Sequence, residues 1–247
     1  MNTQLAIKNN KIYVLEVNPR ASRTVPFVAK ARGIPLAKIA AKIMIGEKLN
    51  DILKEYKVRE LSNYNVKESV FPFNKFDGVD LILGPEMKST GEVMGIDDNF
   101  LSSYIKSQIA CGNILPSKGN VFISIDDDNK ESIISIAQKL IKLNFNLIAT
   151  KGTAKLLNNR GIITKQINKV KEGSPHIVDS LKDNKIDLVI NTTKSQSSVK
   201  DSYSIRRTSL MYNIPYYTTI AGAKVAVDAI EFIEKNDFNI RSLQKIN

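Results

Sequence analysis

Residues 119–153 read GNVFISIDDDNKESIISIAQKLIKLNFNLIATKGT, and this stretch holds two apolar strand patterns separated by one helix pattern. The segments 121–125 and 145–150 are short apolar runs bounded by polar residues, which is typical of buried strands. Residues 129–143 between them have the length and spacing of a helix. A strand, a helix and a second strand in this order predict a parallel strand pair covered by the helix.

The same alternation continues towards the C-terminus. We expect helices over 152–158, 175–183, 199–212 and 221–235, and extended segments over 162–167, 186–190 and 215–218. Strands that alternate with helices predict a parallel sheet with helices on both faces. The sequence therefore predicts a compact α/β domain over residues 119–247.

Polar residues cluster where these strands are expected to end. Ligands of open parallel sheets bind outside the carboxyl ends of the strands. The run Thr150-Lys151-Gly152-Thr153 joins a strand to a helix, whose free N–H groups and threonine hydroxyls can hold an anion. The predicted phosphate-binding residues are Lys130, Thr150, Thr153, Lys169, Asn191 and Thr193.

The N-terminal residues predict a metal site. Residues 3–16 indicate a β-hairpin, which we expect to close with a three-residue turn at Asn9-Asn10-Lys11. Glu16 and Asn18 are two apart on a strand and share one face, and this turn would place Gln4 opposite Glu16. Carboxylate and amide oxygens suit a hard cation such as Mg²⁺ or Mn²⁺.

Two arginines follow these predicted ligands. Arg20 and Arg23 would lie near the phosphate oxygens of a metal-bound nucleotide, which guanidinium groups bind well. Beyond them the sequence indicates helices over 24–31, 35–46 and 98–110, a strand over 66–73, an ordered loop over 76–95 and a linker over 112–120.

Composition limits the classes of protein to which the chain can belong. The net charge is +11, but it is spread mostly as isolated lysines, which argues against a nucleic-acid interface. A single cysteine, Cys111, excludes an internal disulfide framework. The chain has neither an apolar run long enough for a membrane span nor a signal-peptide core near its start. We therefore expect a cytoplasmic protein with no nucleic-acid or membrane partner.

Three motifs are more specific than any of these patterns. They are EVNPRASRTVP at 16–26, VKESVFPFNKF at 66–76 and GPEMKSTGEVMG at 84–95. Through them the chain resembles the C-terminal segment of the carbamoyl-phosphate synthetase large chain over nearly its whole length. The resemblance implies a C-terminal portion of an ATP-grasp module at 1–118, followed by a methylglyoxal-synthase-like, Rossmann-like regulatory domain at 119–247.

The resemblance also implies a function. In the family, an ATP-dependent, glutamine-hydrolysing ligase phosphorylates carbamate to carbamoyl phosphate for pyrimidine and arginine biosynthesis. It implies ATP and Mg²⁺ or Mn²⁺ as cofactors, and it implies the N-terminal part of the large chain and a glutaminase small subunit as partners. The regulatory domain is expected to bind nucleoside monophosphates, and Glu68, Tyr216 and Thr218 match positions that bind ornithine.

Some parts of an ATP-grasp enzyme are not found in the sequence. No stretch supplies the glycine-rich phosphate loop, the nucleotide-binding lysine or the adenine pocket, so we expect a C-terminal piece that is inactive alone. Two alternatives stay open. One is a stand-alone effector-binding module, and the other is a methylglyoxal-synthase-type lyase using His176 and Asp179, although the resemblance favours a structural or effector-loop role for His176.

Overall fold

The structure is a computed structural model, and it describes residues 1–56, 62–75, 80–82, 88–193, 199–200, 202–237 and 239–243. Its largest unit is a five-stranded sheet ordered β7-β6-β5-β8-β9, in which every neighbouring pair is parallel. The strands are β5 (Gly119–Ser124), β6 (Phe145–Thr150), β7 (Thr164–Ile167), β8 (Leu188–Asn191) and β9 (Tyr216–Tyr217). This confirms the predicted α/β fold with a parallel sheet.

Helices cover both faces of this sheet because its strands are apolar on both sides. Val121 and Ile123 point into one core with α5, α6 and α10, whereas Phe122 and Val189 point into the other core with α7 and α9. Successive side chains of a strand alternate between faces, so each face needs its own cover. The helices are α5 (Lys130–Lys142), α6 (Lys151–Asn159), α7 (Ile177–Lys182), α9 (Tyr203–Met211) and α10 (Ile220–Lys235).

The N-terminal hairpin consists of β1 (Asn2–Lys8) and β2 (Lys11–Asn18). Lys8 pairs with Lys11, so the turn has two residues, and the predicted three-residue turn was wrong. Asn9 and Asn10 both have positive φ, as the favoured two-residue turn requires. A bulge next to Gln4 then shifts the register by one residue, and this brings Gln4 opposite Glu16 as predicted.

Three short helices follow the hairpin. They are α1 (Thr24–Arg32), α2 (Leu36–Met44) and α3 (Leu49–Lys54), and the last of these was missed by the sequence analysis. Six residues are too few to show helical periodicity, so α3 depends on packing. Ile52 of α3 is buried against Ile34 and Ile39 in a small separate core.

The middle of the molecule is an antiparallel pair, β3 (Tyr64–Val70) and β4 (Gly91–Asp97), with α4 (Phe100–Ala110) packed on it. Residues 91–95 were predicted as loop, and this was wrong because Gly95 belongs to a strand and allows close packing of α4. A side chain at Gly95 would collide with the Ser103 carbonyl of α4. Residues 76–79 and 83–87 of the predicted loop lie outside the described residues.

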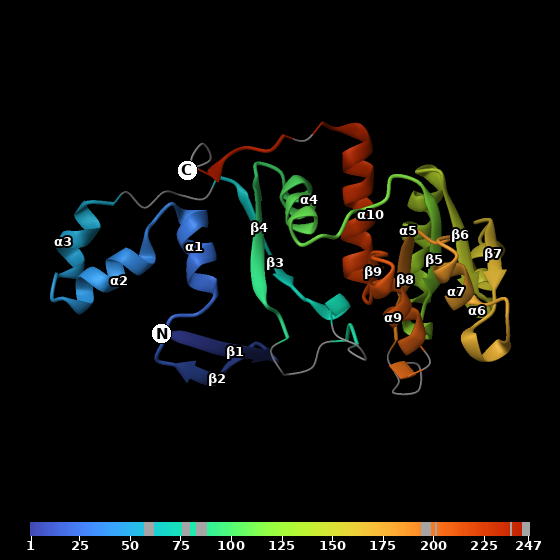
Figure 1. Cartoon of the computed structure of the whole chain (residues 1–247), viewed down its shortest axis with the longest axis horizontal. Coiled ribbons are helices and arrows are strands. Elements are labelled where there is room, and N and C mark those ends of the chain that lie inside the picture. Colours follow the sequence, from blue (N-terminus) through green and yellow to red (C-terminus); the bar gives the residue numbers. More distant parts are fainter. Residues whose placement is uncertain are drawn as a thin grey trace.

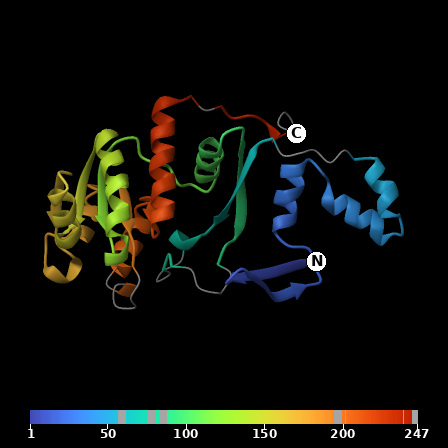
Figure 2. The ribbon, with the colours of Figure 1, turned by 180° about the vertical axis from the view of Figure 1, so that it is seen from behind.

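The elements follow one another along the molecule. Figure 1 shows β1, β2 and α1–α3 at one end, β3, β4 and α4 in the middle, and the parallel sheet with its helices at the other end. Figure 2 shows the same order from behind, with α10 between α4 and the sheet. Helix α10 packs against both α4 and α5, so it joins the middle of the molecule to the parallel sheet. None of the described helices is long and apolar enough to cross a membrane.

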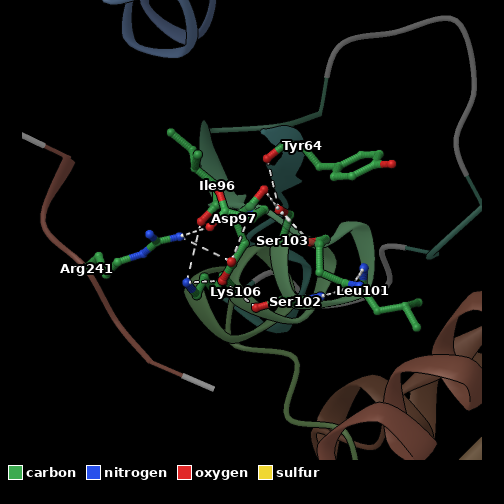
Figure 3. A network of polar contacts seen from close by, with 10 residues as sticks. Tyr64, Ile96, Asp97, Leu101, Ser102, Ser103, Lys106 and Arg241 are labelled. Atoms are coloured by element: carbon green, nitrogen blue, oxygen red, sulfur yellow. Dashed lines mark hydrogen bonds and ion pairs between the residues drawn. The ribbon is translucent and has the colours of Figure 1, made fainter. Parts of the chain in front are cut away.

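The C-terminal segment returns to the middle of the molecule, where it meets a polar network around Asp97 (Figure 3). Arg241 of this segment forms ion pairs with Asp97 and Asp98. Lys106 Nζ and Ser102 Oγ each lie 2.6 Å from Oδ2 of Asp97. Burial raises the pKa of Asp97, but the bonds from Lys106 and Ser102 outweigh it and lower the pKa to about 2.

Candidate functional site

A cavity of about 420 Å³ opens at the carboxyl ends of β5, β6 and β8. Thr150 and Asn191 are the last residues of two of these strands, so their side chains reach the opening. Lys169 enters from the loop after β7, and Thr193 from the loop after β8. The structure therefore brings four of the six predicted phosphate-binding residues around one space.

The other two predicted residues lie beside this cavity and do not line it. Thr153 is buried, and its hydroxyl accepts a hydrogen bond of 3.3 Å from the Ile125 N–H. Lys130 forms an ion pair of 2.5 Å with Asp127. Both side chains therefore contact the loop after β5.

Three carboxylates at the rim were missed by the sequence analysis: Asp126, Asp127 and Asp128 line the cavity. Lys171, which was also missed, lines the cavity together with Lys169. The lining carboxylates therefore come from the loop after β5, and the lining lysines come from the loop after β7. The signal was available, because the three aspartates directly follow a predicted strand and belong to the same carboxyl-end edge.

A second cavity of about 380 Å³ lies between the middle of the molecule and the parallel sheet. Glu68 reaches it from β3, whereas Tyr216 and Thr218 reach it from β9 and the residue that follows. The three residues predicted from the resemblance to bind ornithine therefore line one space, although they come from opposite halves of the chain.

Glu68 is held in place by residues that the sequence analysis did not single out. Its Oε2 accepts a hydrogen bond of 3.0 Å from Gln108 Nε2, and the side-chain oxygen Oε1 of Gln108 accepts one of 3.3 Å from Asn113 Nδ2. Burial raises the pKa of Glu68, and the Gln108 bond partly opposes this. A desolvated carboxylate of this kind gains most from a cationic ligand, because the cation supplies the missing charge partner.

The predicted metal ligands share one face of the hairpin. Gln4 pairs with Glu16 across the strands, and Asn18 Nδ2 donates a 2.8 Å hydrogen bond to Glu16 Oε1. One carboxylate and two amides fit one side of a Mg²⁺ site. Among the described residues no group of three or more histidine, cysteine or acidic side chains could complete such a site.

The two arginines make local contacts near this hairpin. Arg20 donates to the Ala21 carbonyl at 3.3 Å. Arg23 donates to the carbonyl and the hydroxyl of Ser89 at 3.0 and 3.1 Å, which ties the start of α1 to the segment before β4. Both side chains are exposed, so an incoming anion could reach them.

Comparison with known proteins identifies the relationship. Residues 132–218 match the family model described as "MGS-like domain", and residues 1–52 match "Carbamoyl-phosphate synthase L chain, ATP binding domain". Carbamoyl phosphate synthase large chains of Rhizobium meliloti and Myxococcus xanthus are 49% and 50% identical over 99% of this chain. The Pseudomonas putida large chain is 48% identical over all of it. The chain is homologous to the C-terminal part of carbamoyl phosphate synthase large chains.

The chain spans about a fifth of the length of these relatives, with coverage of 21%, 22% and 23% respectively. The resemblance stated from the sequence is therefore confirmed, and the similarity is to one part of these large chains. A crystal structure of methylglyoxal synthase from Elizabethkingia anophelis aligns with 46% of this chain at 20% identity and a TM-score of 0.37, and it covers 79% of that protein.

The contacts of His176 are those of a residue that caps a helix. His176 is the N-cap of α7, where Nδ1 accepts from the Asp179 N–H while Asp179 accepts from the His176 N–H at 2.9 Å. Such a capping box satisfies two free donors at the helix start. Neither residue lines the cavity at the strand ends, so neither would contact a ligand bound there in this arrangement.

Proposed function

We propose that this chain acts as the C-terminal segment of a carbamoyl phosphate synthase large chain. In this role it contributes one wall of the Mg²⁺–ATP site at which carbamate is phosphorylated to carbamoyl phosphate. It also carries a regulatory domain that binds a nucleoside monophosphate. The remainder of the large chain and a glutaminase subunit would be its partners.

The observation that carries the regulatory proposal is the divided charge of the cavity at the strand ends. Lys169 and the N-terminus of α6 at Thr150 offer donors for a phosphate group. The aspartates at 126–128 repel a bare phosphate but can accept hydrogen bonds from sugar hydroxyls. A ligand with a phosphate at one end and a sugar at the other satisfies both sides, whereas inorganic phosphate does not.

Calorimetric titration of the 247-residue chain tests this proposal. UMP and AMP serve as pyrimidine and purine probes, and we expect both to bind more tightly than inorganic phosphate. Lys169→Met should weaken nucleotide binding about tenfold or more, because a charged hydrogen bond is lost. Lys155→Met is the control, since Lys155 is an exposed residue of α6 outside the cavity. No nucleotide binding, or an equal loss in both variants, contradicts the proposal.

The hairpin supports the proposed metal wall. Gln4, Glu16 and Asn18 would hold Mg²⁺, and a bound Mg²⁺ neutralises phosphate oxygens of ATP. Arg20 and Arg23 would bind the phosphoryl group being transferred, where positive charge stabilises the developing negative charge. The hairpin exposes apolar side chains on both faces, with Ile12 at 68% exposure on one face and Tyr13 at 48% on the other. Strands that are apolar on both faces are typical of a larger sheet with a covering layer on each side, as an ATP-grasp domain would supply.

Mn²⁺ binding tests the metal wall in this chain. Paramagnetic broadening of backbone NMR signals should appear first at Gln4, Glu16 and Asn18, with weak affinity because the set is partial. Glu16→Gln should abolish it, since the only carboxylate is lost. Glu47→Gln, which alters another exposed acid, should leave it unchanged. Broadening that survives Glu16→Gln would place the metal elsewhere.

The second cavity supports a cationic amino acid as an additional effector. The Glu68 carboxylate can pair with the ligand's ammonium, while the Tyr216 and Thr218 hydroxyls can orient its polar groups. L-Ornithine is the probe. Titration should show binding that Glu68→Gln weakens about tenfold. Binding that is unaffected by this change would move the ornithine site away from Glu68.

One observation favours a second candidate function. The described residues form a whole cavity for an anion but only one wall of a metal site, which is what a stand-alone nucleoside-monophosphate-binding module without catalysis would show. Mixing the chain with the N-terminal part of a homologous large chain distinguishes the two. Restored carbamate-dependent ATP hydrolysis supports the synthase role, and nucleotide binding without restoration supports the module.

A further inference from the structure

The two cavities share one hydrogen bond. Asn191 lines the cavity at the strand ends, and Tyr216 lines the cavity between the two halves of the molecule. Asn191 Nδ2 donates to the Tyr216 hydroxyl at 2.7 Å. A ligand that binds the Asn191 amide in the first cavity therefore affects the Tyr216 hydroxyl, which lines the second cavity.

A buried arginine stands at the same place. Arg206 is 1% exposed and lies on α9 between Ile205, which lines the first cavity, and Ser209, which lines the second. Its Nε and Nη2 donate to the two carboxylate oxygens of Asp80 at 2.6 and 2.5 Å. Nη2 also donates to the Val199 carbonyl at 2.9 Å. This bidentate pair joins α9 of the sheet domain to a segment 126 residues earlier in the chain.

One donor of this guanidinium is unused. Arg206 Nη1 is buried and has no hydrogen-bond partner, which is costly for a charged group. The guanidinium lies close to Tyr216. Burial raises the pKa of the Tyr216 hydroxyl, while Asn191 and the Arg206 charge lower it. Asn191 and Arg206 thus both act on one hydroxyl.

We infer that Arg206, held by Asp80, couples the two cavities through the Tyr216 hydroxyl. A ligand that draws the Asn191 amide into the first cavity weakens its bond to Tyr216, and Arg206 Nη1 then becomes the hydroxyl's donor. Tyr216 shifts within the second cavity, where Leu81, the neighbour of Asp80, is also a lining residue. Arg206 and Asp80 are positioning residues, because neither lines a cavity. This inference rests on the proposed binding of a nucleotide and an amino acid.

The test measures binding linkage in the whole chain. The dissociation constant of L-ornithine is measured by calorimetry with and without saturating UMP, in the wild type and in Asp80→Asn. Asparagine keeps the shape of aspartate but removes the charge that orients Arg206. Arg206→Lys is a second variant, which keeps the charge and removes the forked donors.

Asp228→Asn is the matched control. Asp228 forms an ion pair with Lys139 at 2.6 Å and is 29% exposed, against 26% for Asp80, but it lies outside both cavities and outside the Arg206 cluster. A general effect of removing a half-buried acid should therefore appear equally in this variant.

In the wild type and the control, we expect UMP to change the L-ornithine dissociation constant about fivefold or more. In Asp80→Asn and Arg206→Lys the change should fall below about twofold, while each ligand alone still binds. A merely structural role would weaken both ligands and leave the ratio intact. Coupling that is absent in the wild type, or that survives in both variants, overturns the inference. Failure of either probe to bind the wild type overturns the proposed function instead.

Discussion

Asp97 is the residue at which the C-terminal segment, β4 and α4 meet. It is 17% exposed, and its carboxylate is bound by Lys106, Ser102 and Arg241. Its pKa of about 2 lies below the ordinary value of an unfolded aspartate, about 4. A lowered pKa in the folded state adds stability above the unfolded pKa, and that stability is lost as the pH falls through the folded value.

We predict that the free energy of unfolding decreases between about pH 5 and pH 2, with about 1 kcal/mol of the decrease arising from Asp97 after solvent screening. Asp97→Asn should lack this part of the pH dependence and be less stable at pH 7. Urea unfolding followed by circular dichroism at several pH values measures both effects.

The control for this prediction is Asp51→Asn, since Asp51 pairs with Lys54 at an exposed site. Its pH profile should match that of the wild type. A wild-type profile that Asp97→Asn leaves unaltered would show that the Asp97 network does not contribute to stability.

At the scale of elements, strand β4 contains two glycines, Gly91 and Gly95, in different surroundings. Gly95 faces α4 so closely that a Cβ atom would meet the backbone of Ser103 and Ser107, which cannot move without displacing the helix. Gly91 lies at the other end of β4, with no atom within 4 Å of the place where its Cβ would stand. The two glycines differ only in what packs against them.

We predict that Gly95→Ala lowers the free energy of unfolding by about 2 kcal/mol, because overpacking forces α4 away from the strand. Gly91→Ala is the matched control in the same strand and should change it by no more than about 0.5 kcal/mol. Denaturant unfolding of the two variants measures the difference. Equal effects would show that α4 does not press on β4.

At the scale of the whole molecule, the apolar core is distributed unevenly. Among the described residues, the two large cores around the parallel sheet are built from residues after position 114, whereas the core under α2 and α3 consists of Ile34, Ile39 and Ile52 with Leu36 and Tyr56 packed against it. The hairpin β1–β2 adds no buried apolar side chain. Stability should therefore reside mainly in the second half of the chain.

We predict that a fragment of residues 119–243 unfolds in one cooperative thermal transition, and that a fragment of residues 1–118 shows none. The midpoint of the first fragment should lie about 10 °C below that of the whole chain, because Arg206 loses Asp80 and is left as an unpaired buried charge. Circular dichroism during heating measures this. A cooperative transition in the 1–118 fragment would contradict it.

The sequence alone determined the parallel sheet and the edge at which its cavity opens. Strand and helix periods are local properties, so the alternation after residue 119 predicts both the layers and the carboxyl ends where Thr150 and Asn191 stand. The same rule reaches Asp126, although the prediction did not use it. The confirmed family relationship was also readable, because motifs such as residues 84–95 are long and specific.

Only the tertiary structure decided which distant side chains meet. The two-residue turn with its bulge, the close approach of α4 to Gly95 and the pairing of Asp80 with Arg206 are absent from any local pattern. Glu68 was singled out through the family resemblance, yet its Gln108 partner emerged only from the packing of α4 on β3. The reason is physical: a sequence pattern reports which face of an element is buried, whereas contacts depend on how separate elements pack in space.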